Sequence, residues 1–392
     1  MPNEVVYLDH AATTPLDERV FEAMLPHLLG ANLRGNPSSL HALGAAARDA
    51  VEESRTWVSR LVGAGTGEIL FTAGGTESDN LAVLGLAAAN PEKRHVVFSA
   101  VEHAAVRGAA SHLEAKGYEI TRVGVDQNGV VDPSELAEGL RPETALAAIM
   151  WANNEVGAVQ PVEEIARICA EAGVPLHVDA VQAAGRLPID VSRVPVSTLA
   201  VSAHKIYGPQ GVGALYAREG VQVAPLVFGG GQEKGLRSGT ENVAGIAGFG
   251  AAARLASEEM EERTRHEEAL REALISGTTG LPGVRLNGHP EKRLSNSVHL
   301  SVEGIEAESL VLYLDALGYA VGSGSACASG TAGHKASPVL LAMGRSENEA
   351  FSALRITPGK DTTEGEVEGF LGAFFVAVSR LREVSTYTLA ER

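Results

Sequence analysis

The sequence predicts an α/β fold in which a large domain with a mainly parallel seven-stranded sheet joins a smaller α+β C-terminal domain. Apolar, strand-like runs alternate with helical patterns from about Glu68 to Ala217, an order that favours a parallel sheet covered by helices. A long segment rich in Glu and Arg follows, and a shorter set of strand and helix patterns comes after it. A chain of 392 residues is long enough to build two hydrophobic cores.

The first part of the chain carries the strands of the predicted large sheet. Each run is short, apolar and bounded by polar or glycine residues, which is typical of buried strands. The amphipathic stretches 134–140 and 162–172 predict helices between them. The predicted strands are 69–71, 95–99, 119–123, 145–150, 176–178, 198–201 and 213–216.

The second part begins with the segment 253–274, whose apolar residues recur at helical spacing. We interpret it as a long, solvated helix that leads into the small domain. The small domain then has predicted strands at 297–302 and 353–357 and a helix at 308–317. These patterns place the large domain at residues 16–258, and the small domain at residues 1–15 and 259–392. Gly, Ser and Ala crowd the stretch from about 321 to 337, which predicts a mobile loop.

The composition excludes several classes of protein. A formal net charge of −17 argues against a general nucleic-acid or membrane surface, since either needs a basic face. We find no apolar run long enough to span a bilayer and no signal peptide at the start. With only Cys169 and Cys327, a disulfide framework is not expected, and a reducing, cytoplasmic location fits. No Cys/His cluster has metal-ligand spacing, so we predict no metal site.

Two predicted strands are followed by groups that suit one cofactor. Asp179 comes directly after the strand 176–178, and Lys205 follows the strand 198–201. A lysine can form an imine with the aldehyde of pyridoxal phosphate, while an acid keeps the pyridine nitrogen protonated. Taken singly, Lys205 also fits a solvated strand end, and Asp179 a turn. The catalytic interpretation requires a partly desolvated amine, because burial lowers the pKa of lysine.

Two further strand ends carry polar groups. Gly74, Gly75 and Thr76 follow the strand 69–71 and precede a helical run, where free N–H groups and a hydroxyl can bind a phosphate. A plain N-cap with a glycine turn is the alternative. His103 follows the strand 95–99, and its ring could stack on an aromatic cofactor and relay protons. A hydrogen-bonded loop histidine fits that position equally well.

The small domain adds two candidate residues. Cys327 has only small, flexible neighbours, which favours an exposed and reactive thiol, whereas Cys169 lies in an apolar helical pattern and is expected to fill the core. Arg355 is a charge inside a short strand-like run. It could be paired structurally, or it could grip a substrate carboxylate with its planar fork.

Ten short motifs occur in one order along nearly the whole chain. They are residues 7–14 (YLDHAATT), 35–39 (GNPSS), 76–80 (TESDN), 102–103 (EH), 153–157 (NNEVG), 177–182 (HVDAVQ), 202–205 (SAHK), 229–233 (GGGQE), 237–240 (RSGT) and 323–327 (SGSAC). With them the chain resembles the cysteine desulfurases related to NifS and IscS, which are class-V aminotransferase-type enzymes. This resemblance implies the aspartate-aminotransferase-like fold of enzymes that use pyridoxal 5′-phosphate.

The resemblance also implies a role for each matching residue. Lys205 binds the cofactor covalently, Asp179 pairs with its ring nitrogen, and Cys327 accepts the sulfur. Gln182 and His103 contact the cofactor ring, and His103 also transfers protons. The cofactor phosphate contacts Gly75, Thr76, Ser202 and His204, together with Thr240 of the other subunit, which implies a homodimer. Asn154, which also lies near the ring, and Arg355 bind the substrate carboxylate.

The implied activity converts L-cysteine to L-alanine and leaves the sulfur on Cys327 as a persulfide. An acceptor protein of iron–sulfur cluster assembly or of a thiolation pathway would then take the sulfur. A selenocysteine lyase or another aminotransferase-like enzyme on the same fold is the nearest alternative, and a non-catalytic sulfur carrier is a more distant one. A dinucleotide-dependent oxidoreductase is disfavoured because the glycine fingerprint is absent. One departure from the family is a lengthened segment, 330–336, between Cys327 and Ser337.

Overall fold

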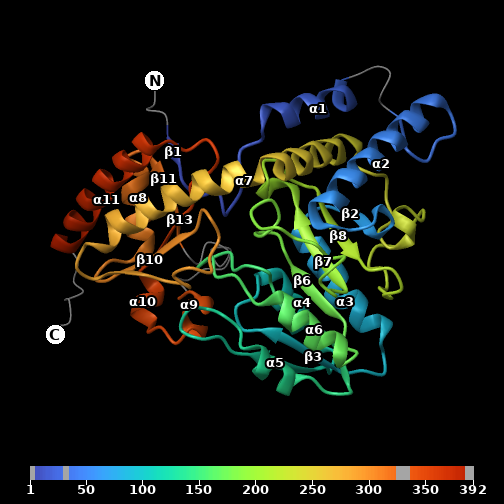
Figure 1. Cartoon of the computed structure of the whole chain (residues 1–392), viewed down its shortest axis with the longest axis horizontal. Coiled ribbons are helices and arrows are strands. Elements are labelled where there is room, and N and C mark those ends of the chain that lie inside the picture. Colours follow the sequence, from blue (N-terminus) through green and yellow to red (C-terminus); the bar gives the residue numbers. More distant parts are fainter. Residues whose placement is uncertain (1–4, 30–34, 324–335, 385–392) are drawn as a thin grey trace.

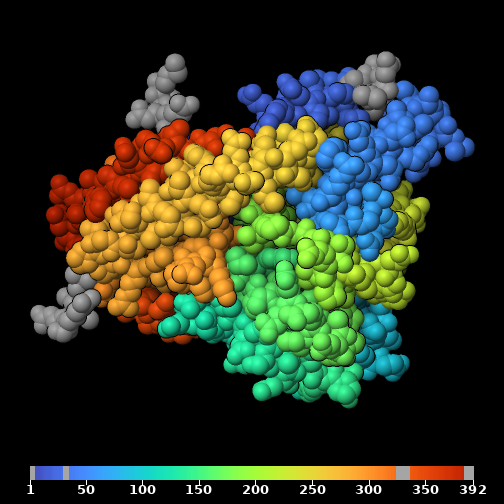
Figure 2. Space-filling model, in the orientation of Figure 1, coloured from blue at the N-terminus to red at the C-terminus, as the bar shows by residue number. Residues whose placement is uncertain are grey.

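The computed structural model describes residues 5–29, 35–323 and 336–384. Two α/β parts lie side by side, and the long helix α7 (Val243–Thr279) extends along both of them (Figure 1). In the space-filling view α7 forms a continuous ridge across the junction of the two parts (Figure 2). Among the described residues, no helix combines the length and the apolar character that crossing a bilayer requires.

The large part is built on a seven-stranded sheet with the strand order β2-β8-β7-β6-β5-β3-β4. All neighbouring pairs are parallel except those of β8, which is antiparallel to both β2 and β7. The predicted mainly parallel sheet is therefore confirmed. Its strands are β2 (Ile69–Thr72), β3 (His95–Ser99), β4 (Glu119–Val123), β5 (Thr144–Ala148), β6 (Leu176–Asp179), β7 (Thr198–Ser202) and β8 (Gly213–Ala217).

The prediction for β5 was too long at its C-terminal end. The strand ends at Ala148, whereas the apolar run continues to Met150. The N–H of Met150 donates to Oε1 of Glu102 instead of to a neighbouring strand. Ile149 and Trp151 still donate their N–H groups to His177 and Asp179 of β6, so the apolar run marked burial and continued contact with β6 but not the end of the regular strand.

Helices cover both faces of this sheet because successive side chains of a strand point to opposite sides. Val96 and Phe98 of β3 pack in one core with α3 and α4, while Val97 packs in another with α2, α6 and α7. The helices of this part are α1 (Glu18–Leu29), α2 (Ala42–Val62), α3 (Gly75–Ala89), α4 (Ala104–Ala115), α5 (Pro133–Gly139) and α6 (Val162–Glu171), with short 3₁₀ turns η1 (Thr66–Glu68), η2 (Ala203–Lys205) and η3 (Glu233–Gly235).

The small part has its own core around an antiparallel four-stranded sheet of order β12-β13-β10-β9. A short parallel pair, β1 with β11, brings the N-terminal segment onto this part. The elements are β1 (Val6–Tyr7), β9 (Val284–Leu286), β10 (Val298–Val302), β11 (Tyr319–Ala320), β12 (Gly322–Ser323), β13 (Ala353–Ile356), α8 (Ala307–Ala316), α9 (Pro338–Ala342), α10 (Glu347–Phe351) and α11 (Glu364–Val384).

Helix α7 differs from the solvated helix that we predicted. It begins ten residues earlier, and it buries Leu270 and Leu274 together with the charged side chains of Arg263, Glu267 and Arg271. Charged residues on a helix usually indicate a solvated face, but here ion pairs and hydrogen bonds allow them to be buried. The proposed domain boundary at 258/259 falls inside this unbroken helix and remains a prediction.

Candidate active site

A pocket of about 850 Å³ lies where several strands of the large sheet end and where Arg355 of β13 approaches from the small part. The carboxyl ends of parallel strands meet at one edge of a sheet, so residues that follow different strands come together there. Of the predicted site residues, ten line this pocket: Gly75, Thr76, His103, Asn154, Asp179, Gln182, Ser202, His204, Lys205 and Arg355.

Lys205 occupies the 3₁₀ turn that follows β7, and its amine points back to the N-terminal segment. Its Nζ donates to the carbonyl oxygens of Ala11 at 2.5 Å and Ala12 at 2.7 Å. The backbone carbonyl of Lys205 accepts a hydrogen bond from Nη1 of buried Arg186. The lysine is therefore held from both ends where it lines the pocket.

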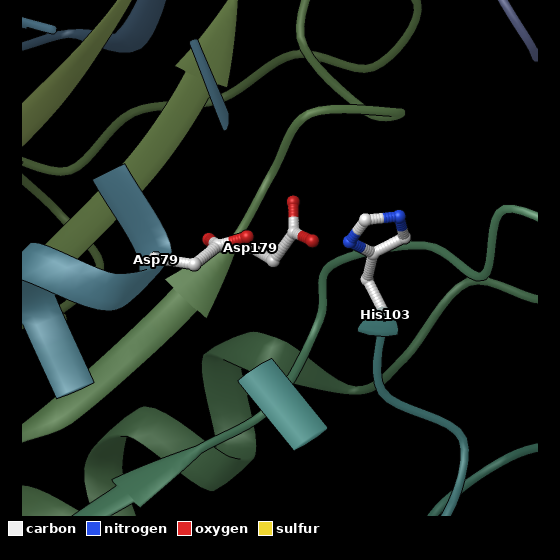
Figure 3. Close-up of side chains that lie close together, drawn as sticks. All are labelled: Asp79, His103 and Asp179. Atoms are coloured by element: carbon white, nitrogen blue, oxygen red, sulfur yellow. The ribbon is translucent and has the colours of Figure 1, made fainter. Parts of the chain in front are cut away.

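Asp179 ends β6 at the floor of the pocket, between Asp79 of α3 and His103 (Figure 3). One polar atom from each of these three side chains lies within 4.8 Å of the other two. Burial raises the pKa of Asp179, while His103, the N–H of Val181 at 2.9 Å and Lys205 act in the opposite direction. Asp179 is thus a buried acid with several groups that stabilise its ionised form.

His103 caps the N-terminus of α4 and has a defined tautomer. Its Nδ1 accepts the N–H of Ala105 at 3.2 Å, so the proton of the neutral ring is on Nε2. The residue before it, Glu102, is fully buried and accepts hydrogen bonds from Ser99 and Met150. Burial raises the pKa of Glu102 to about 8. The hydrogen bonds of Glu102 hold the backbone next to His103 and so position its imidazole in the pocket.

The start of α3 and the end of β7 meet in a corner of the pocket whose groups could bind an anion. Gly74 has φ 148°, which favours glycine, and a side chain on Gly75 would meet the Val181 side chain at 2.8 Å. Because Gly75 has no side chain, the start of α3 can lie close to Val181, and the first N–H groups of the helix can point to an anion in the pocket. Across from it, the hydroxyl of Ser202 is buried and has no hydrogen-bond partner among the described residues. Burial and the charge of Lys205 lower the pKa of His204 to about 4, so its ring is neutral.

The other side of the pocket holds the groups that could bind a carboxylate. Arg355 is 4% exposed; its Nη2 donates to Oδ1 of Asp9, and its Nη1 donates to the carbonyl oxygen of Asn154. Its Nε has no hydrogen-bond partner among the described residues. Gln182 donates its amide to the carbonyl of Ala11 at 2.9 Å. A partly satisfied, buried guanidinium is suited to bind an anionic substrate.

Two predicted residues are not in this pocket. Thr240 is exposed and lines a smaller neighbouring pocket of about 120 Å³, which is formed around η3 and the end of β2. Cys327, like most of the predicted mobile loop, lies outside the described residues. The roles that we predict for both residues remain predictions.

Sequence reasoning also missed contributors to the site. Ala11 and Ala12 contact Lys205 through backbone carbonyls, which no side-chain pattern reveals. Asp79 belongs to the 76–80 motif, but we gave it no role. The available signal was an acid next to the apolar run that begins at Leu81, where a charge has to be paired or neutralised.

Comparison with known proteins agrees with this architecture. The sequence model of the family Aminotransferase class-V matches residues 6–370. The chain is 43% identical to "Cysteine desulfurase IscS" of Methanosarcina thermophila, over 99% of this chain and 96% of that protein. It is 44% identical to "Cysteine desulfurase IscS" of Neisseria meningitidis serogroup C, over 97% of this chain and 94% of the relative.

Among solved structures, one titled "NIFS-LIKE PROTEIN" superposes with a TM-score of 0.89 at 38% identity, over 96% of this chain and all of the other. DndA from Streptomyces lividans superposes with a TM-score of 0.77 at 36% identity, over 90% and 99% of the two chains. Both the sequence matches and the structural matches extend over nearly the full length. The chain belongs to the class-V aminotransferase family, within the cysteine desulfurases related to IscS and NifS.

Proposed function

We propose that the protein is a pyridoxal 5′-phosphate-dependent cysteine desulfurase. It converts L-cysteine to L-alanine and transfers the sulfur to Cys327 as a persulfide. The observation that carries the proposal is the meeting of Lys205 and Asp179 in one pocket, together with a corner at the start of α3 whose groups could bind an anion. The curated relatives named above carry the name of this activity.

The residues present fit this cofactor. The buried acid Asp179 suits a pyridinium nitrogen, and the imidazole of His103 lies next to it. The unpartnered hydroxyl of Ser202 and the free N–H groups at the start of α3 suit a phosphate. Gln182 would contact the ring hydroxyl. In addition to Gly75 and Ser202, the phosphate would contact Thr76, His204 and, from a second copy of the chain, Thr240.

We assign the group of Asp79, His103 and Asp179 to the cofactor rather than to a metal ion. Burial raises the pKa of both acids, and each would have to be ionised to bind a metal. A pyridinium ring requires only one anion at this position. The predicted absence of a metal site stays a prediction.

The cofactor supplies an electron sink for the bonds at the substrate Cα. Within that chemistry, the amine of Lys205 is positioned to remove and return protons at Cα, since it lies in the pocket next to the carbonyl oxygens of Ala11 and Ala12. Asp179, ionised, stabilises positive charge at the ring nitrogen. His103 holds one proton on Nε2 and can exchange it with a substrate atom.

Arg355 and Asn154 would orient the substrate. The guanidinium offers Nε as a free donor, and its planar fork matches a carboxylate. Asn154 lines the same pocket, and its backbone carbonyl accepts a hydrogen bond from Arg355, which connects the two residues. Their position determines which bond at Cα points to Lys205.

The sulfur step is a transfer between two sulfur atoms. The thiolate of Cys327 attacks the sulfur of the substrate, an S–S bond forms and the C–S bond breaks. The electron pair stays with the substrate carbon, which takes up a proton and leaves as alanine. No external oxidant or reductant is required, since one thiol and one cysteine give one persulfide and one alanine. An acceptor protein, for iron–sulfur assembly or thiolation, then removes the sulfur.

The assembly and the location belong to the same proposal. Thr240 is exposed next to a pocket that it does not share with Lys205, which supports a homodimer in which it completes the site of the partner copy. A cytoplasmic enzyme is consistent with two cysteines and no predicted disulfide. Neither nucleic acid nor membrane is an expected partner.

The test is a direct assay of both products. Purified enzyme with L-cysteine should release alanine and form a persulfide on Cys327 in equal amounts during the first turnover. Lys205→Ala should lose both products and the visible absorbance of the bound cofactor, while Lys116→Ala, at an exposed position, should keep all three. Faster turnover of selenocysteine than of cysteine, or transamination of alanine with a keto acid, would favour one of the alternative enzymes.

A further inference from the structure

Asp79 is a second buried acid at the floor of the pocket, and the proposed mechanism gives it no task. It lies in the second turn of α3 and is 1% exposed. Figure 3 shows its carboxyl group next to that of Asp179, with the ring of His103 beyond. Two buried carboxyl groups so close together cannot both be ionised without a large electrostatic penalty.

A row of buried polar groups leads to Asp79 from inside the sheet. Oδ1 of Asp79 lies 3.2 Å from Nε2 of His177, and Nδ1 of His177 lies 3.0 Å from the hydroxyl of Thr198. Both partners are fully buried. Burial lowers the pKa of His177 to about 3, so its ring is neutral and provides no positive charge that would stabilise an anion at Asp79.

The two acids differ in what surrounds them. Asp179 has a backbone N–H donor and faces His103 and Lys205. Asp79 is more deeply buried and faces Asp179, and both its burial and the charge of Asp179 oppose its ionisation.

The other elements packed on α3 do not change this balance. Strands β2, β5 and β7 contain no ionisable residue, and β8 contributes only Tyr216. Helix α4 carries Arg107, which donates to the backbone carbonyl of Glu102, and His112 and Glu114, which are both exposed. On α3 itself, Glu77 pairs with Arg237 at 2.8 Å. The proton therefore belongs on Asp79 and the charge on Asp179.

We infer that Asp79 is a positioning residue that holds a proton next to Asp179 and so keeps Asp179 the one ionised carboxylate under the cofactor nitrogen. The inference rests on the proposed function, because it requires a pyridinium ring above Asp179. If Asp79 were ionised instead, Asp179 would take up the proton and could no longer stabilise that ring. The neutral carboxyl of Asp79 also gives Asp179 a further polar neighbour, which an apolar side chain would not provide.

The protonation state can be tested without measuring activity. Asp79→Asn has the same shape and is neutral at every pH, so it imitates the proposed state. A buried acid with a raised folded-state pKa contributes stability that is complete below its unfolded value of about 3.9 and is lost as the pH rises. Thermal unfolding of the holoenzyme should therefore show Asp79→Asn to be more stable than wild type at pH 8, with the difference shrinking toward pH 4.

Two results would overturn this part of the inference. An Asp79→Asn variant that is less stable than wild type at pH 8 would mean that Asp79 is ionised and stabilised as an anion. A difference that does not depend on pH would mean that Asp79 does not hold a raised pKa. An infrared band of a protonated carboxyl group at pH 7.5, present in wild type and lost in Asp79→Asn, is the expected independent result.

The positioning role is tested by the binding of pyridoxal phosphate. The dissociation constant of the cofactor should stay within about threefold of wild type in Asp79→Asn, which restores the neutral polar group. It should rise about tenfold in Asp79→Leu, which has similar size but removes the neutral polar group beside Asp179. The pH at which the visible spectrum of the bound cofactor changes should shift in the leucine variant alone.

The outcomes separate this inference from the proposed function. Wild-type protein that takes up no pyridoxal phosphate would contradict the proposed function itself. Normal uptake by wild type, with the same dissociation constant and the same spectral profile in Asp79→Leu, would overturn only the role of Asp79. Weak binding in both variants would also overturn it, because the neutral amide would then have failed to replace the carboxyl group.

Discussion

Arg355 donates Nη2 to Oδ1 of Asp9 across 2.8 Å, so the cation that we expect to bind the substrate carboxylate is already paired with an acid. The pair joins β13 of the small part to the N-terminal segment that also holds Lys205 through Ala11 and Ala12. Two of the three guanidinium nitrogens are used in this way. The orientation of the arginine is therefore fixed before substrate arrives.

Arg355→Lys should raise KM for L-cysteine at least about tenfold and change kcat less. A lysine ammonium cannot contact Asp9 and Asn154 and still present a free donor in the plane of a carboxylate. Steady-state kinetics measure the effect. Arg285→Lys, at an exposed ion pair in β9, is the matched control and should leave KM unchanged. An unaltered KM in Arg355→Lys would remove Arg355 from substrate binding.

Cys327→Ser should keep the visible absorbance of the bound cofactor and lose the persulfide. The matched control is Cys169→Ala, because burial raises the pKa of Cys169 to about 12 and leaves its thiol unreactive. That variant should still form the persulfide and should lose about 1 kcal/mol of unfolding free energy from the packing defect. Mass spectrometry of thiol-alkylated peptides identifies the sulfur acceptor. Wild-type release of alanine by Cys327→Ser would show that another group attacks the sulfur.

The buried pair of Glu155 and Ser337 should make stability depend on pH. Ser337 precedes α9 and donates its hydroxyl to Oε2 of Glu155 at 2.5 Å, and burial raises the pKa of Glu155 to about 7. Because this folded-state pKa lies above the unfolded value of about 4.3, the stability contributed by protonated Glu155 is complete below pH 4.3 and is lost between there and about pH 7.

Glu155→Gln should therefore be more stable than wild type at pH 8, by up to about 3 kcal/mol, and equal to it near pH 4. Denaturant unfolding at several pH values measures the difference. Glu164→Gln, at an exposed position in the first turn of α6, should follow the wild-type curve at every pH. A wild-type advantage that grows as the pH rises would indicate that Glu155 is an anion in the folded protein.

Glu233→Gln should lower the free energy of unfolding by about 3–5 kcal/mol. Glu233 accepts two hydrogen bonds from Arg55 and one from the N–H of Phe71, and both charged residues are 8% exposed. The variant leaves a buried guanidinium without its main counter-ion. Glu52→Gln removes the exposed partner of the same arginine and should change the free energy by less than about 1 kcal/mol. Equal losses of unfolding free energy in Glu233→Gln and Glu52→Gln would contradict the claim that burial makes the pair of Glu233 and Arg55 the stronger one.

The sequence predicted the sheet and the floor of the pocket well because both depend on local pattern. Each strand is a short apolar run; Asp179 ends β6 and Lys205 lies in the turn after the neighbouring β7, so their meeting follows from parallel pairing. The N-terminal contact with Lys205 was not predictable in the same way. Ala11 and Ala12 act through backbone carbonyls, and only tertiary packing brings them to the amine.

Buried charges account for the other differences. The pattern of α7 indicated a solvated helix, yet Glu267 is buried because Ser295 donates to it and Arg186 lies nearby. Asp79 likewise lies in the interior of α3, where a single acid in a helix has no pattern of its own. Whether such a residue is exposed, paired or neutral depends on partners that are distant in the sequence.

The most direct measurement is reduction of the purified holoenzyme with borohydride, followed by peptide mass mapping. Reduction makes the bond between a lysine amine and the aldehyde of the cofactor permanent. We predict that the added mass of the reduced pyridoxal group is found on the peptide that contains Lys205. The same mass on a different peptide, or on no peptide of a protein saturated with cofactor, would contradict the assignment of this pocket.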